Sequence, residues 1–98
     1  MQARTDDRDP DHLKLILSRT TVLAGEVKVE FNNAFAEDPH DLLVERAGGS
    51  GASYVFPELG PGEVDRRTVA LDAGEWRLRC TIPTHAERGM KAALTVTG

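Results

Sequence analysis

Three potential metal ligands lie within eleven residues near the C-terminal end of the chain: Cys80, His85 and Met90. A fourth, His40, follows a proline about half the chain earlier. A thiolate, two imidazoles and a thioether form the ligand set of trigonal copper sites, in which the methionine makes a long axial bond. Soft sulfur ligands select copper over hard cations. The sequence therefore predicts one bound copper ion that carries single electrons.

The combination of these residues is more informative than any one of them. A single buried cysteine usually acts as a small hydrophobic side chain, and a single methionine often fills a gap in the core. A lone histidine at the start of a strand usually faces solvent. The sequence combines an inward cysteine at a strand end with His85 and Met90 at five-residue intervals and with a distant histidine. This combination favours a metal site. His12 has no such companions, and we expect it to be exposed.

Alternating apolar and polar residues predict the strands that must position these ligands. The inward positions are Leu13, Leu15 and Leu17; Val27, Val29 and Phe31; Leu42 and Val44; Val69 and Leu71; Trp76, Leu78 and Cys80; and Ala92, Leu94 and Val96. Turn signals rich in glycine separate these runs, and no stretch keeps a helical period. The sequence predicts an all-β, Greek-key β-sandwich of about seven to eight strands. Residues 47–63 are the least regular part, with one short strand expected at 53–56.

Parity along the strands brings the four ligands to one place. Cys80 occupies the same inward face as Trp76 and Leu78, and His40 shares parity with Leu42 and Val44. We expect the strand at 74–80 to run antiparallel to both the strand at 40–45 and the strand at 91–97. All four ligands would then meet at one end of the sandwich.

Length and composition limit the classes of protein. A chain of 98 residues is one small domain; we expect a flexible acidic lead-in at 1–11 and the folded domain at 12–98. A single cysteine excludes an internal disulfide, a four-cysteine site and a dinuclear copper centre with two bridging thiolates. The net charge of −4 gives no indication of the basic surface that nucleic-acid binding requires. No apolar run is long enough for membrane insertion, and the lead-in fits either the remnant of a missing tether or a tail without function.

The segments at 38–42 and 80–96 resemble the copper-binding segments of the cupredoxins, the plastocyanin and azurin family. The spacing of the ligands is closest to that of the rusticyanin-type loop. The resemblance covers most of residues 12–97 and implies a cupredoxin sandwich with one type 1 copper ion. It makes His40, Cys80 and His85 the equatorial ligands and Met90 the axial ligand.

Two positions depart from the pattern of this family. Asp41 stands where many relatives have an asparagine that ties the two ligand-bearing segments together. Its carboxylate either lowers the reduction potential of the copper or simply faces water. Arg79 stands where many relatives carry an aromatic residue, and its effect is expected on the outer face. The exposed arginines at 66, 67, 77, 79 and 88 either steer an acidic partner or, the interpretation we favour, pair with neighbouring carboxylates.

The resemblance implies a blue copper electron-transfer protein rather than an enzyme, because a complete ligand set leaves no open position for a substrate. The electron is expected to leave near His85. The expected partner is a redox protein such as a c-type cytochrome, an oxidase or a reductase, and the protein is expected to be a monomer in the periplasm or another extracytoplasmic space. A copper storage or delivery protein is the alternative, followed by an interaction module without metal.

Overall fold

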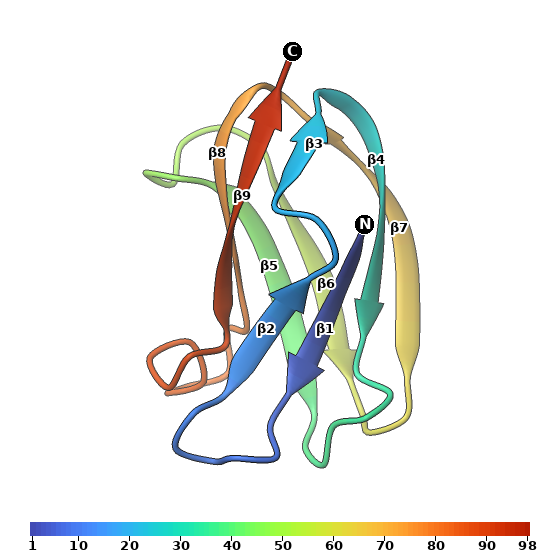
Figure 1. The fold of residues 1–98 in the computed structure, drawn as a ribbon, viewed down its shortest axis with the longest axis vertical. Helices are drawn as coiled ribbons and strands as arrows, with labels where there is room; N and C mark the ends of the chain where they lie inside the picture. The colour runs from blue at the N-terminus through green and yellow to red at the C-terminus, as the bar shows by residue number, and fades with distance from the viewer.

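The computed structural model describes all 98 residues as two packed β-sheets (Figure 1). The strands are β1 (Gln2–Asp6), β2 (Lys14–Leu17), β3 (Thr21–Leu23), β4 (Gly25–Asn32), β5 (His40–Arg46), β6 (Ser53–Leu59), β7 (Val64–Leu71), β8 (Gly74–Arg79) and β9 (Lys91–Thr97). The first sheet has the order β2-β1-β4-β7, and the second has the order β3-β9-β8-β5-β6. The predicted all-β sandwich is confirmed, with nine strands. No helix has the length and apolar character that crossing a bilayer demands.

The second sheet carries the strands that border the predicted ligands. β8 is antiparallel to β5 and to β9, as the sequence predicts. In the antiparallel register, Leu43 lies opposite Arg79 on one side of β8, and Lys91 lies opposite Arg79 on the other. The start of β5, the end of β8 and the start of β9 therefore meet at the same end of the sheet.

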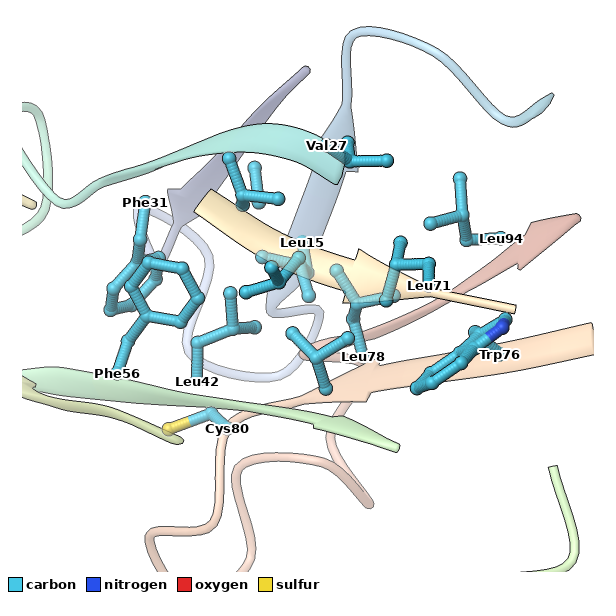
Figure 2. Close-up of a cluster of buried hydrophobic side chains, with 14 of the residues drawn as sticks. Leu15, Val27, Phe31, Leu42, Phe56, Leu71, Trp76, Leu78, Cys80 and Leu94 are labelled. Carbon is cyan, nitrogen blue, oxygen red and sulfur yellow. The ribbon is translucent and has the colours of Figure 1, made fainter. Parts of the chain in front are cut away.

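The hydrophobic core fills the space between the two sheets (Figure 2). Its side chains come from alternate positions of the strands, because successive residues of a strand face opposite sides. Trp76 is almost fully buried, and its indole N–H donates to the carbonyl oxygen of Asp72 at 2.9 Å. Cys80 belongs to the same buried cluster and lies toward the end that holds Phe31 and Phe56 (Figure 2). The core therefore encloses the cysteine while leaving it next to the loops.

The N-terminal segment departs from the prediction of a flexible lead-in over residues 1–11. Residues Gln2–Asp6 form β1, which pairs antiparallel with β2 and parallel with β4. Ala3 and Thr5 are buried, at 0% and 1% exposure. Ala3 belongs to the core cluster, and the hydroxyl of Thr5 donates to the side-chain oxygen of Asn33. The prediction of a mobile segment is therefore wrong for these residues, which form part of the sandwich.

The irregular segment at 47–63 contains a longer strand than expected. The structure extends the predicted strand at 53–56 to Ser53–Leu59, and β6 is an edge strand of its sheet. Pro57 lies within it, which an edge strand tolerates because one side of the strand needs no backbone donor. Tyr54 links this strand to the other sheet, since its hydroxyl donates to the carbonyl oxygen of Ala70.

Three connections gather at one end of the molecule, the lower end in Figure 1. They join β1 to β2 (residues 7–13), β4 to β5 (residues 33–39) and β8 to β9 (residues 80–90). Two of them lead into or contain predicted ligands. The fold therefore brings segments from the beginning, middle and end of the chain to one small region.

Candidate metal centre

Three donor atoms from two distant parts of the chain converge at this end of the sandwich. The Nδ1 atoms of His40 and His85 are 3.2 Å apart, and Sγ of Cys80 lies 3.9 Å from the first and 3.5 Å from the second. The point equidistant from the three atoms is about 2.1 Å from each, which is the length of a nitrogen–metal bond in proteins and slightly short of a sulfur–metal bond. Donor atoms this close repel one another unless a proton or a cation lies between them. Two imidazoles and a thiol in this triangle fit a soft transition-metal ion such as copper.

Cys80 follows directly after β8 and keeps the inward direction that the strand parity predicts. It is 1% exposed. Its backbone N–H donates to the carbonyl oxygen of Met90 at 3.1 Å, which closes the base of the ligand loop at 81–89. Burial raises the pKa of its thiol to about 11, although backbone hydrogen bonds from Asp41 and Ile82 oppose this rise. Such a thiol is unreactive by itself, and a bound cation would deprotonate it.

His40 is the first residue of β5 and is fully buried. Its Nε2 atom lies 2.9 Å from Oδ2 of Asp7, so this ring nitrogen donates and Nδ1 keeps the lone pair that faces Cys80. Asp7 also accepts the backbone N–H groups of Glu37 and Asp38. Burial alone would raise the pKa of Asp7, but these hydrogen bonds, including that from His40, hold it below its usual value. The sequence interpretation assigned no role to Asp7.

The loop before His40 is held by a second buried polar residue. The side chain of Asn33 is fully buried and donates to the carbonyl oxygens of Asp38, Leu59 and Gly60, at 3.1, 3.0 and 3.2 Å. Its amide oxygen accepts a hydrogen bond from the hydroxyl of Thr5 at 2.5 Å. These contacts connect β1, the loop at 33–39 and the end of β6. These contacts therefore hold the loop that leads into His40.

His85 lies in the ligand loop and is the only half-buried member of the donor triangle. Its N–H donates to the carbonyl oxygen of Ile82 at 3.1 Å, and its own carbonyl oxygen accepts the N–H of Met90 at 3.0 Å. Burial lowers the pKa of His85, and the nearby charge of Arg88 lowers it further. A neutral imidazole is the form that binds a metal, and the lowered pKa favours that form at neutral pH.

Met90 directly precedes β9 and is fully buried. The loop that leads to it packs on the segment before β2, where the N–H of Leu13 donates to the carbonyl oxygen of Arg88 at 2.9 Å. The guanidinium of Arg88 donates to the carbonyl oxygen of Pro10. Gly89 has a φ of +118°, and a Cβ atom there would overlap the carbonyl oxygen of Leu13. The placement of Met90 thus depends on the N-terminal segment, and axial ligation by Met90 stays a prediction.

Asp41 ties the two ligand-bearing segments together. Its carboxylate accepts the backbone N–H of Thr81 at 2.6 Å and the hydroxyl of the same residue. The bond joins the residue after His40 to the residue after Cys80. Asp41 therefore occupies both the position and the linking role that the resemblance gives to an asparagine. Its charge adds to the effect of burial in raising the pKa of Cys80.

The remaining predicted surface features lie outside the site. Three of the exposed arginines pair with carboxylates: Arg66 with Glu30, Arg67 with Asp65 and Arg79 with Glu45. This pattern agrees with the interpretation of a solvated, paired surface. The side chain of His12 is 77% exposed and contacts Asp9, as expected for a histidine without a metal.

Comparison with solved structures identifies proteins of the same fold. The reduced auracyanin of the photosynthetic bacterium Roseiflexus castenholzii matches 99% of this chain and 95% of its own, with a TM-score of 0.71 and 18% identity. Auracyanin A, described as a "blue" copper protein from the green thermophilic photosynthetic bacterium Chloroflexus aurantiacus, matches 99% of this chain and 98% of its own, with a TM-score of 0.68 and 18% identity. A reduced amicyanin variant matches 98% of this chain and 80% of its own, with a TM-score of 0.65 and 16% identity.

No protein-family model matches the sequence, and no curated protein matches it either. The likeness to auracyanin and amicyanin is therefore visible in the backbone and hardly in the sequence. It spans nearly the whole chain, the N-terminal strand included. The cupredoxin-like sandwich predicted from the resemblance of two short segments is confirmed as the fold.

Proposed function

We propose that this protein holds a mononuclear type 1 copper ion and carries single electrons between redox proteins. His40, Cys80 and His85 are the equatorial ligands, and Met90 is the axial ligand. The observation that supports the proposal is the convergence of two Nδ1 atoms and one sulfur within 3.9 Å of one another, with His40 distant in the chain from Cys80 and His85. Two histidines and a cysteine in a trigonal arrangement are the donor set of blue copper sites.

The bound copper would supply a one-electron couple between Cu(I) and Cu(II). A trigonal site with one sulfur and a weak axial contact lies between the geometries that the two oxidation states prefer. The protein keeps its donors in that arrangement through contacts that need no metal: Asp7 holds His40, Asp41 ties the two ligand-bearing segments, and turn hydrogen bonds hold His85. Little movement is then required when the electron arrives or leaves.

His85 is the proposed exit for the electron, because it is the only member of the donor triangle with exposed surface. Phe35 and Pro39 in the loop before His40 are exposed, as is Pro83 in the ligand loop, and Phe35 is 72% exposed. Apolar residues of this kind allow a short-lived contact with another protein. We propose a redox protein partner such as a c-type cytochrome, an oxidase or a reductase, a monomeric carrier, and a periplasmic or other extracytoplasmic location.

Addition of one equivalent of Cu(II) to the purified apoprotein tests the copper site. The expected result is an intense visible absorption band from the thiolate and a narrow copper hyperfine splitting in the electron paramagnetic resonance spectrum. Cys80→Ser should lose the band, whereas His12→Ala should keep it, since His12 is exposed and outside the site. A pale, ordinary Cu(II) spectrum from the unaltered protein would refute the type 1 site.

The rate of electron exchange distinguishes a carrier from a copper store. A carrier should exchange electrons rapidly with a small redox partner and should retain its copper against a Cu(I) chelator. A store or delivery protein should release Cu(I) to the chelator and exchange electrons slowly. Stopped-flow mixing of the oxidised protein with a small one-electron reductant, followed by loss of the visible band, gives the rate of electron exchange, and competition with the chelator gives the rate of Cu(I) release.

A further inference from the structure

The carboxylate of Asp7 lies on the far side of His40 from the donor triangle. Its residue is 5% exposed, and its side chain is 1% exposed. Oδ2 lies 2.9 Å from Nε2 of His40, while Nδ1 of the same ring faces Cys80 and His85. Carboxylate, imidazole and the proposed copper position are therefore arranged in series.

The hydrogen bonds around Asp7 favour the ionised form of the carboxylate. Oδ1 accepts the N–H of Glu37 at 2.9 Å, and Oδ2 accepts the N–H of Asp38 at 2.9 Å in addition to the bond from His40. Both backbone partners are N–H donors, one to each carboxylate oxygen, and this arrangement favours the charged carboxylate, to which Nε2 of His40 then donates. A carboxylate surrounded by N–H donors is stabilised in its charged form.

We propose that Asp7 is a positioning residue that fixes the ring and tautomer of His40 and places a buried negative charge behind this copper ligand. The first part follows from the geometry alone, whereas the second rests on the proposed function. A carboxylate that accepts the remote ring N–H orients a metal-binding histidine and makes its other nitrogen a stronger donor. A stronger donor and a nearby negative charge both stabilise Cu(II) relative to Cu(I). The reduction potential is lower than it would be without the Asp7 charge.

Asp7 also connects two loops, and a purely structural link would give a different result. Its hydrogen bonds with the backbone of Glu37 and Asp38 link the connection at 7–13 to the connection at 33–39. If that link were its whole role, removing its charge would alter stability and leave the potential and the His40 ring proton unaffected. The His40 ring proton therefore tests the positioning role, and the reduction potential tests the effect of the charge.

The first test uses the metal-free, unaltered protein labelled with ¹⁵N. Nuclear magnetic resonance should show one His40 tautomer, protonated at Nε2, with a proton that is shifted downfield and exchanges slowly with water. A His40 ring protonated at Nδ1, or a rapidly exchanging Nε2 proton, would overturn the positioning role. Because no copper is involved, this result stands even if the protein proves not to bind copper.

Two variants separate positioning from charge. In Asp7→Ala the Nε2 proton should exchange faster and the second tautomer should become detectable; an unchanged resonance and exchange rate would overturn the positioning role. In Asp7→Asn the amide oxygen can still accept the His40 proton, but the charge is gone, and the potential measured by voltammetry should move to a more positive value. Asp9→Asn removes the same charge from an exposed side chain of the same loop and should produce a smaller shift. Equal shifts in the two asparagine variants would overturn the proposed effect of the charge.

Discussion

Gly89 allows the ligand loop to lie against the N-terminal segment, and its replacement by alanine is expected to destabilise the protein strongly. Its φ of +118° is unfavourable for any residue with a side chain, and the added Cβ would overlap the carbonyl oxygen of Leu13. That oxygen belongs to the backbone of a buried residue and cannot rotate away as a flexible side chain would. The loop would have to move, and the hydrogen bond from Leu13 to Arg88 would be lost.

The expected cost has two parts. Holding alanine at an unfavourable φ costs about 1–3 kcal/mol. Leaving a buried backbone group without its hydrogen bond adds about 1–3 kcal/mol. The sum of about 2–6 kcal/mol is a large part of the total stability of a domain of this size, which is about 5–15 kcal/mol.

Gly25 provides a matched control, because its φ of +122° is nearly the same and an added Cβ would meet nothing within 4 Å. Gly25→Ala should therefore show only the backbone cost. Urea unfolding of both apoproteins measures the difference, expected to be about 1–3 kcal/mol in favour of Gly25→Ala. Equal losses of stability would show that the close approach to Leu13 is not a constraint on the loop.

The apoprotein should lose stability as pH rises from 9 toward 11. Burial raises the pKa of the Cys80 thiol from 9.0 to about 11. The folded state therefore keeps this proton at pH values where the unfolded chain has released it, and unfolding becomes more favourable. Urea unfolding at several alkaline pH values should show this loss in the native sequence and a smaller one in Cys80→Ala; identical pH profiles would contradict it. Met90→Leu should keep the intense visible band and raise the potential, because a weak electron-donating contact to Cu(II) is removed; an unchanged potential in voltammetry would show that Met90 is not a ligand. Asp41→Asn should keep its link to Thr81, because the amide oxygen can accept the Thr81 N–H and the amide N–H can donate to the Thr81 hydroxyl. The variant should raise the reduction potential and change the unfolding free energy by less than about 1 kcal/mol. No change in potential would mean that water screens the Asp41 charge.

The sequence predicts the central strands and the inward direction of the donors because their apolar residues alternate regularly. Cys80 follows the parity of Trp76 and Leu78, and the structure buries all three. His40 follows the parity of Leu42, even though the pairing of β5 with β6 is irregular between these two residues. Local periodicity was sufficient here, since one buried face determines which side chains point inward.

The N-terminal part of the site could not be predicted from the same kind of pattern. β1 buries Ala3 and Thr5, which carry no apolar periodicity, and its strand exists because it pairs with β2 and β4. Asp7 looks like any other acidic residue in the sequence, and its partner His40 lies 33 residues away. Ala3, Thr5 and Asp7 occupy alternate positions in the sequence, but a small residue, a hydroxyl and a carboxylate in that order are too weak a signal to identify a buried hydrogen-bond network.

The donors of the metal site are separated by long stretches of chain, and this separation has a consequence for the order of folding and metal loading. His40 and Cys80 are 40 residues apart, and β3 pairs with β9 through Thr21 and Thr95. Contacts between such distant residues require the closure of long loops, so the complete triangle forms only when β5 and β8 have paired. Before that point, copper can meet the nearby donors Cys80, His85 and Met90, without His40. We therefore expect copper to enter a site that folding has already completed, and early copper binding to the unfolded chain to slow its assembly.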